Sequence, residues 1–188
     1  MKKSLVIAVL VIIGTLIAHH VNAKNQIGVY LTAQDYKEKK LSYAGGSKIR
    51  LNNSVLELPY ITVIDSNKTI KLKKSEVFGY AEADSKDFRF YNNTQYRILE
   101  AGPITIYVQS EHVAQSKGYK VKQNYYFSTT VSGKLMPLTL NNIRQAYHAN
   151  TQFIEQVDQY FSNGDVTVFD SVHNMYKLNY VFAKAQNK

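Results

Sequence analysis

The side chains in this sequence that could carry out acid–base chemistry or hold a metal are few and scattered. Beyond the first twenty-three residues the histidines are His112, His148 and His173. Asp170 and His173 are three positions apart, a spacing that puts two side chains on one side of a helix. Protein metal sites usually need three protein ligands, and no third one lies nearby in the sequence. We therefore predict no metal and no cofactor, and keep these four residues as candidates for ionisable chemistry only.

No other set of residues has the spacing of a catalytic site. Glu111 and His112 follow the strand expected at 104–109, so we expect them in an exposed loop, without a marked serine or threonine nucleophile. The chain also has no cysteine. Disulfide scaffolds, thiolate zinc sites, iron–sulfur clusters and cysteine nucleophiles are therefore excluded. We predict no catalytic residue from the sequence.

A cluster of lysines is the clearest binding feature. Lys68, Lys71, Lys73 and Lys74 lie on or beside an alternating segment, close to a hairpin rich in phenylalanine and tyrosine. Basic residues beside stacking aromatic rings can bind single-stranded nucleic acid or sugars. Alternating lysines on a short strand also protect a sheet edge from pairing with other chains. The cluster is thus a possible face for an anionic ligand, or simply a protected edge.

The first segment has the layout of a secretory signal. Lys2 and Lys3 precede an apolar stretch over 5–18, and Ala23 ends a stretch suited to cleavage. The apolar stretch is shorter than the roughly 20 residues that span a bilayer, although a retained anchor is the alternative. We expect a mature chain of residues 24–188, exported to the periplasm or the medium. It has 21 basic and 14 acidic side chains, so its net charge is +7 rather than the +9 of the whole chain.

Up to about residue 137 the hydrophobic pattern repeats every two residues, as in strands that are buried on one face. The pattern predicts a hairpin of 60–64 with 69–73, a second hairpin of 76–82 with 86–90, and a strand at 104–109. A longer strand at 119–129 is expected to pair with 131–136. Short strands at this close spacing favour an antiparallel meander that curls into a barrel-like sheet.

The turn at Asn92 and Asn93 allows a sharper prediction. A two-residue loop would place Phe88 opposite Arg97 and mix apolar and charged side chains on one face. A three-residue loop that includes Tyr91 would place Phe88 opposite an aromatic residue, with Asn93 at a positive φ that asparagine tolerates. We therefore predict the three-residue loop.

After residue 137 the pattern becomes helical. Thr139 is expected to cap a helix that ends near Tyr147, and an apolar stripe predicts a second helix that stops at Gly164. A third helix is expected after Asp165, with Phe169, Val172, Tyr176 and Tyr180 facing inward. The predicted fold class is α+β, a single domain over 24–188 with a β-rich part (24–137) and a helical part (138–188) packed on it.

Several motifs resemble those of uncharacterised exported proteins from Bacteroidota. They are the run from Lys71 to Tyr80, the segments 88–91 and 96–107, the Pro137-Leu138-Thr139 entry to the helices, and Met175-Tyr176-Lys177 near the end. The resemblance implies a location in the envelope of a Gram-negative cell. It implies no activity, and it identifies no functional residue.

Three hypotheses for function are compatible with these features. The first is a non-enzymatic envelope module that binds a polymer or protein partner, because the polar groups are spread along the chain. The second is a small hydrolase or metal-dependent enzyme whose site forms only in three dimensions. The third is binding of an anionic envelope polymer through the lysine-rich strands. Nucleic acid is not expected as a partner, because the excess charge is carried mainly by lysine and the chain is expected to be exported.

Overall fold

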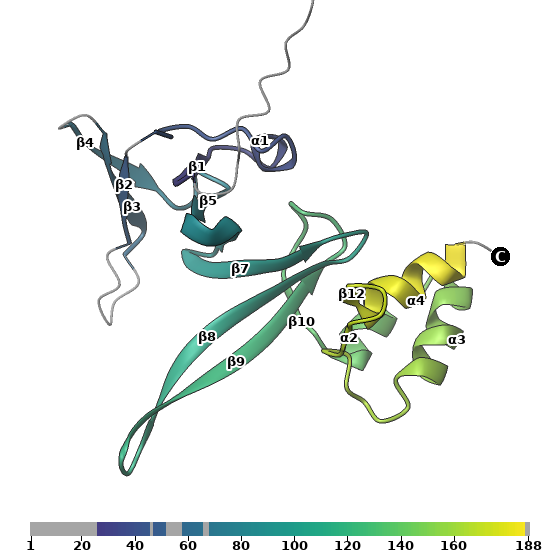
Figure 1. Ribbon diagram of the computed structural model, residues 1–188. Coiled ribbons are helices and arrows are strands. Elements are labelled where there is room, and N and C mark those ends of the chain that lie inside the picture. Colours follow the sequence, from purple (N-terminus) through teal and green to yellow (C-terminus); the bar gives the residue numbers. More distant parts are fainter. Residues whose placement is uncertain (1–25, 46, 52–57, 66–67, 187–188) are drawn as a thin grey trace, which may run out of the picture.

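The computed structural model describes residues 26–45, 47–51, 58–65 and 68–186, so the predicted signal segment lies outside the described residues. The α+β class is confirmed, with antiparallel sheets first and most helical residues last (Figure 1). The main sheet has the order β1-β5-β6-β7-β8-β9-β10. Its strands are β1 (Gly28–Tyr30), β5 (Gly79–Glu82), β6 (Lys86–Tyr91), β7 (Thr94–Ala101), β8 (Thr105–Gln115), β9 (Gly118–Ser128) and β10 (Met136–Pro137).

A smaller sheet packs on the β5–β6 end of the main sheet. It consists of β2 (Lys48–Arg50), β3 (Tyr60–Asp65) and β4 (Lys68–Lys73), in that order. Ile61 and Val63 of β3 are fully buried against Tyr80 and Phe90 of the main sheet, in one hydrophobic cluster. The predicted hairpins of 60–64 with 69–73 and of 76–82 with 86–90 are confirmed by the pairing of β3 with β4 and of β5 with β6.

Helices cover the same face of the main sheet at its β8–β10 end. They are α2 (Leu140–Ala146), α3 (Thr151–Tyr160) and α4 (Lys177–Gln186). As predicted, the Thr139 side chain caps α2, and Phe153 and Val157 of α3 are fully buried. They pack with Ile104, Ile106 and Phe127 of the sheet region into the largest cluster. The apolar stripe of α3 therefore has the partner that its pattern required.

The opposite face of the main sheet holds a buried arginine. Arg89 of β6 is 5% exposed and donates hydrogen bonds to the Tyr107 hydroxyl and to the carbonyls of Ser132 and Gly133, at 3.1, 3.1 and 2.8 Å. These bonds hold the 129–135 loop against the sheet. The helix α1 (Ala33–Lys37) packs on this face too, through Tyr36. Of the segment 131–136 predicted to pair with β9, Met136 alone does so; the loop before it is held instead by this arginine.

Asn179 of α4 fastens the helical layer to the sheet. Its side-chain oxygen accepts from the Ile104 N–H at 2.9 Å, and its amide donates to the Ile104 carbonyl at 2.8 Å and to Glu100 at 2.6 Å. Glu100 also accepts from the backbone N–H of Tyr176, at 2.6 Å, just before α4 begins. A β-bulge between Ile98 and Glu100 shifts the register of β7 against β8 at this point. One buried amide thus joins two parts of the chain about seventy-five residues apart.

Two predictions about the architecture are wrong. The main sheet is an open one, because its order runs from β1 to β10 and these two strands are not paired within the described residues. The third helix begins at Lys177 rather than after Asp165. The residues between form a short hairpin of β11 (Phe169–Asp170) and β12 (Met175–Tyr176). Its turn has Asn174 at φ 51° and Asp170 as acceptor for the N–H groups of Val172 and His173, local bonds that compete with helix.

The three-residue loop at Tyr91–Asn93 is also wrong. Tyr91 pairs with Thr94, so Asn92 and Asn93 form a two-residue loop with φ values of 49° and 66°. Two positive φ values give a turn whose twist matches that of the strands, which favours it over longer loops. Phe88 does lie opposite Arg97, as that loop requires. The pairing is tolerated because this part of the face lines an open pocket, described below, in which the arginine is exposed.

Candidate binding surface

The strands β8 and β9 extend far beyond their neighbours in the sheet. β7 pairs with β8 only from Thr105 to Val108, and β10 pairs with β9 only at Tyr126 and Phe127. Residues 109–124 therefore form a two-stranded ribbon, here called the arm, which projects away from the body (Figure 1). The turn at its tip ends with Gly118 at φ +108°, a backbone conformation suited to glycine.

Every residue of the arm from Ser110 to Gln123 is exposed. The strand register places Ser110, His112 and Ala114 on one side of the ribbon, opposite Gln123, Val121 and Tyr119 respectively. We call these six side chains the arm face. Tyr119 is 77% exposed and Val121 is 51% exposed, unusually high values for apolar residues of a strand. The arm thus offers apolar surface that the fold itself does not bury.

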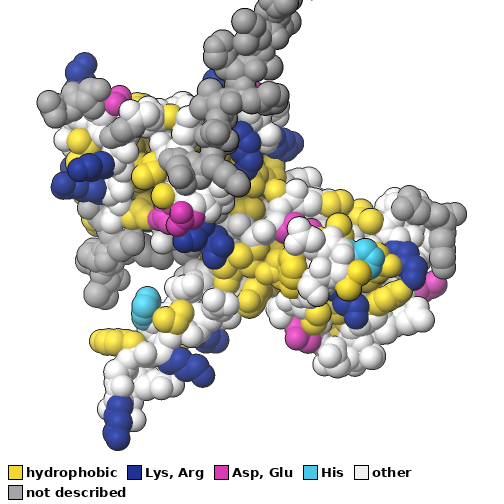
Figure 2. All heavy atoms as spheres, viewed as in Figure 1, with side chains coloured by type: hydrophobic (Ala, Val, Ile, Leu, Met, Phe, Trp, Pro, Cys, Tyr) yellow, Lys and Arg dark blue, Asp and Glu magenta, His cyan; other side chains and the backbone are white. Residues whose placement is uncertain are grey.

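The arm also carries positive charge. Lys117 lies at its tip, and Lys120 and Lys122 lie on the side opposite the arm face. Glu111 lies on that side too and is the one acidic residue of the arm. Figure 2 shows basic side chains along the ribbon beside hydrophobic ones and a histidine. Three lysines against one glutamate give the arm a net charge of +2. A basic projection of this kind attracts an anionic partner.

A pocket of about 310 Å³ lies where the arm meets the body, on the same side of the sheet as the arm face. The small sheet covers one part of this face and the helices cover another, and the pocket lies between the two parts. Phe88 packs in the hydrophobic cluster under the small sheet, and Ile106 packs in the cluster under the helices. We call it the basic pocket. Its lining residues are Lys86, Phe88, Gln95, Arg97, Val108, Gln109, Ser110 and Gln123.

The basic pocket is rich in hydrogen-bond donors. Among the described residues the guanidinium of Arg97 makes no hydrogen bond or ion pair, and it is exposed. Lys86 lies 3.7 Å from the Asp84 carboxylate, a loose and solvent-exposed pair. The Tyr80 hydroxyl donates to the side-chain oxygen of Gln95 at 2.9 Å, which leaves the amide N–H groups of Gln95 for a ligand. No carboxylate is among the lining residues described.

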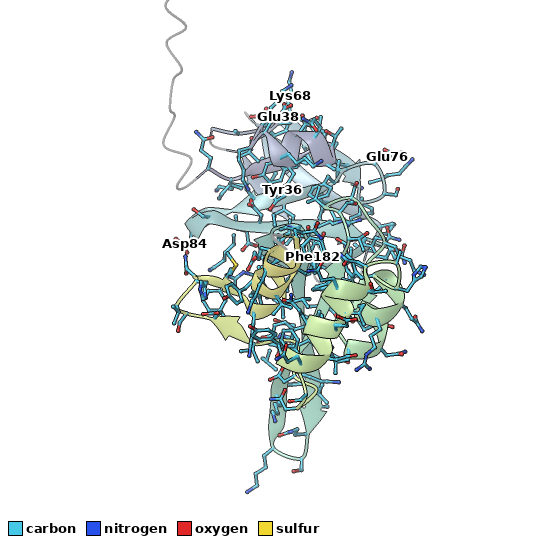
Figure 3. The ribbon with its side chains drawn as sticks, turned by 90° about the vertical axis from the view of Figure 1, so that its right-hand side faces the viewer. Tyr36, Glu38, Lys68, Glu76, Asp84 and Phe182 are labelled. Atoms are coloured by element: carbon cyan, nitrogen blue, oxygen red, sulfur yellow. The ribbon has the colours of Figure 1, made fainter. Side chains whose placement is uncertain are left out.

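The predicted lysine cluster lies elsewhere. Lys68, Lys71 and Lys73 belong to β4, which is an edge strand of the small sheet, and Figure 3 places Lys68 at the end of the molecule opposite the tip of the arm. Most of these charges have partners. Lys73 pairs with Glu76 at 2.8 Å, Lys74 donates to the Asn93 carbonyl at 2.8 Å, and Lys71 lies 4.9 Å from the centre of the Tyr60 ring.

The three histidines lie in separate places. His112 is on the arm face, in a strand rather than in the loop we predicted, although it is exposed as expected. His148 follows α2 and its Nδ1 lies 3.0 Å from the Gln145 carbonyl. His173 is in the β11–β12 turn. Asp170 and His173, which we expected on one side of a helix, are therefore brought together by a turn instead.

Asp170 and His173 do meet. The Nδ1 of His173 lies 2.8 Å from Asp170 Oδ2, and the imidazole stacks on the Tyr180 ring at 4.1 Å between centroids. The hydrogen bond from His173 holds the pKa of the Asp170 carboxyl below its usual value. Within the described residues no group of three histidine, aspartate or glutamate side chains is placed to hold a metal. His173 is exposed and Asp170 is partly buried, and the pair orders the hairpin turn.

A second cavity, of about 470 Å³, lies on the other face of the main sheet, beside α1. Tyr36, Lys37 and Lys39 line it together with threonines that follow β9. Lys39 donates to Asp87 at 2.7 Å, and Tyr30 donates to the other oxygen of the same carboxylate at 2.9 Å. The charge of Lys39 is therefore compensated, which leaves Lys37 as the lining cation without an ion pair among the described residues.

Sequence reasoning missed the arm and the basic pocket. The alternation of Tyr119 and Val121 with Lys120 and Lys122 was visible, but it has the same form as a strand with one buried face. The sequence did not show that β7 and β10 stop short of it. The sequence also does not show that Arg97 lines a pocket, because its neighbours across the strands depend on the register.

Comparison with known proteins identifies no relative: no family model, no curated protein and no solved structure matches this chain. Among the described residues, no helix combines the length and the apolar character needed to cross a membrane.

Proposed function

We propose that this protein is an exported, non-enzymatic module that binds an anionic envelope polymer through the β8–β9 arm. The observation that carries the proposal is the arm itself, which leaves Tyr119 and Val121 exposed on one side of the ribbon, Lys120 and Lys122 exposed on the other, and Lys117 at the tip. A two-stranded ribbon contributes little to a core and is marginally stable by itself. Exposed apolar side chains on such an element are typical of an interaction surface.

The mixture of side chains favours a polymer with both negative charge and apolar faces, such as an acidic polysaccharide. Lysine ammonium groups are strongly hydrated point charges, suited to carboxylates spread along a flexible chain. The phenol ring of Tyr119 offers a flat surface for the apolar side of a sugar ring, with a hydroxyl that can hydrogen-bond at its edge. Glu111 is the one acidic group of the arm and lies opposite Lys122 in the register.

The arm is preferred to the lysine-rich strand β4 because its charges are less engaged. Lys73 and Lys74 of the β4 region contact Glu76 and Asn93. Within the described residues, neither Lys120 nor Lys122 has an ion-pair partner within 4.0 Å. A free cation gains more from an added anion than one already paired.

The test uses the mature chain and immobilised alginate, a polyuronate, with neutral dextran as the control surface. We expect binding to alginate that weakens as salt is added, and little binding to dextran. Changing Lys117, Lys120 and Lys122 together to glutamine should weaken alginate binding at least tenfold at low salt, and Tyr119→Ser should weaken it severalfold. The matched control is Lys68→Gln with Lys71→Gln, which also removes charge from exposed strand residues.

Three outcomes would contradict the proposal. Equal binding to dextran and alginate would exclude the electrostatic part. Loss of binding in the Lys68 and Lys71 variant, with the arm variants unaffected, would assign the function to β4 instead. Binding to an acidic protein but to no polyanion would show that the arm serves a protein partner.

A further inference from the structure

The basic pocket combines the Arg97 guanidinium, which has no ion pair among the described residues, and the loosely paired Lys86 with an apolar floor. We propose that it binds a single acidic sugar unit, a saccharide that carries a carboxylate or a phosphate. This inference rests on the proposed function, because it assigns to one place the recognition of an individual unit of the polymer.

The charge of the pocket selects an anion. Arg97 of β7 and Lys86 of β6 both line it, and a guanidinium without a partner can bind a carboxylate or phosphate with two parallel hydrogen bonds. Asp84 is the carboxylate paired with Lys86, at 3.7 Å, and both side chains are accessible enough to separate. An incoming anion therefore meets two cations and displaces no close ion pair.

The remaining lining groups suit the neutral part of a sugar. Gln95 and Gln123 offer amide groups, and Ser110 offers a hydroxyl. Tyr80 holds the Gln95 oxygen at 2.9 Å, so the donor side of this amide is oriented before a ligand arrives. Phe88, itself stacked on Tyr80 at 4.8 Å, and the largely buried Val108 form the apolar part of the pocket. Fixed donors, hydroxyl-binding amides and an aromatic ring together match a sugar more closely than a bare inorganic anion.

The size and position of the pocket agree with this assignment. A volume of about 310 Å³ lies at the lower end of ligand sites and is large enough for one sugar ring with its charged group. Ser110 and Gln123 belong to both the pocket and the arm face. A polymer chain that occupies the pocket with one unit could therefore continue directly along the arm.

The test measures binding of small ligands to the mature chain by calorimetric titration. The probes are galacturonate, glucose 6-phosphate and their neutral parents galactose and glucose. We expect at least one anionic sugar to bind tenfold or more tightly than its neutral parent. The two anions distinguish a carboxylate from a phosphate as the recognised group.

Two pocket variants and one control make the test specific. Arg97→Gln should weaken binding of the anionic sugar at least tenfold, and Gln95→Glu should abolish it by placing a negative charge in the pocket. Arg144→Gln, which removes an exposed arginine in the helical layer, should leave the affinity unchanged. Thermal unfolding of each variant verifies that the fold is intact.

Each remaining outcome overturns the assignment. Neutral sugars that bind as well as the anions would refute the selection by charge. Unchanged affinity in Arg97→Gln would place the ligand elsewhere. If neither anionic sugar binds while alginate binding still depends on the arm, the pocket assignment fails and the proposed function stands. If alginate binding is absent as well, both fail.

Discussion

The Asn179 amide should be among the most sensitive positions in the fold. In Asn179→Ala the N–H and the carbonyl of Ile104 lose their partners in a fully buried place, and Glu100 loses one of its two hydrogen bonds. Each buried backbone group left without a partner costs about 1–3 kcal/mol, so we expect a loss of about 4 kcal/mol in the free energy of unfolding. For a domain of this size that is a fall of about 8–16 °C in Tm.

Gly102 provides an internal check on this reasoning. A Cβ added at Gly102 would lie 2.8 Å from the side-chain nitrogen of Asn179 and 3.1 Å from its Cγ, and the backbone there is outside the left-handed region. Gly102→Ala should therefore destabilise by about 1–3 kcal/mol through overpacking against one side chain. In the Asn179→Ala background that side chain is gone, so the same change should cost almost nothing.

The coupling between the two sites is measured on four proteins: the parent, Gly102→Ala, Asn179→Ala and the double variant. Their denaturation in urea is monitored by far-UV circular dichroism. We expect the double variant to be more stable than additive effects predict, by about 1–3 kcal/mol. Asn142→Ala is the matched control, since the Asn142 amide donates to an exposed carbonyl and its loss should cost about 0.5 kcal/mol. Additive effects of Gly102→Ala and Asn179→Ala would refute the contact between these two residues. A loss of less than about 1 kcal/mol in the free energy of unfolding of Asn179→Ala would refute the importance of the buried amide for stability.

Further predictions concern a buried cation, a buried hydroxyl and the start of the mature chain. Arg89→Met should cost about 2 kcal/mol, because the carbonyls of the 129–135 loop lose a charged donor, and trypsin should then cut faster at Lys134 than in the parent protein. Equal cutting rates would contradict this. Tyr147→Phe should raise the free energy of unfolding by about 1 kcal/mol, since the buried Tyr147 hydroxyl has no hydrogen-bond partner among the described residues. Burial also raises the pKa of Tyr147 to about 12, so the parent loses stability as pH rises from about 10 through about 12, and the advantage of the phenylalanine variant in urea titrations should grow over that range. In a Gram-negative host, the intact mass of the exported protein should correspond to a chain that begins at Lys24; a mass that includes residues 1–23 would indicate a retained anchor.

The amino-acid sequence was enough to predict the local structure wherever a segment was periodic and bounded by strong start and stop signals. Thr139 caps α2 because its hydroxyl can accept from the N–H of Asn142 in the first turn, and the stripe of α3 needs an apolar partner. The β3–β4 hairpin follows from a β-branched segment, turn residues and an alternating segment in succession. The helix predicted after Asp165 was wrong because the apolar residues there fit a helical stripe, while the hydrogen bonds that Asp170 accepts favour a turn.

Which of the alternating strands are covered depends on long-range packing. Phe90 and Val121 both lie in alternating segments, yet the first is 6% exposed in a core and the second is 51% exposed on the arm. The difference comes from the lengths of the neighbouring strands, which no local pattern encodes. The basic pocket has the same origin. The two-residue turn sets the register that brings Arg97 and Lys86 to one pocket, and neither the small sheet nor the helices cover that part of the face. Local propensity follows from residues near in the sequence, whereas a binding surface depends on which distant elements cover a face and which leave it open.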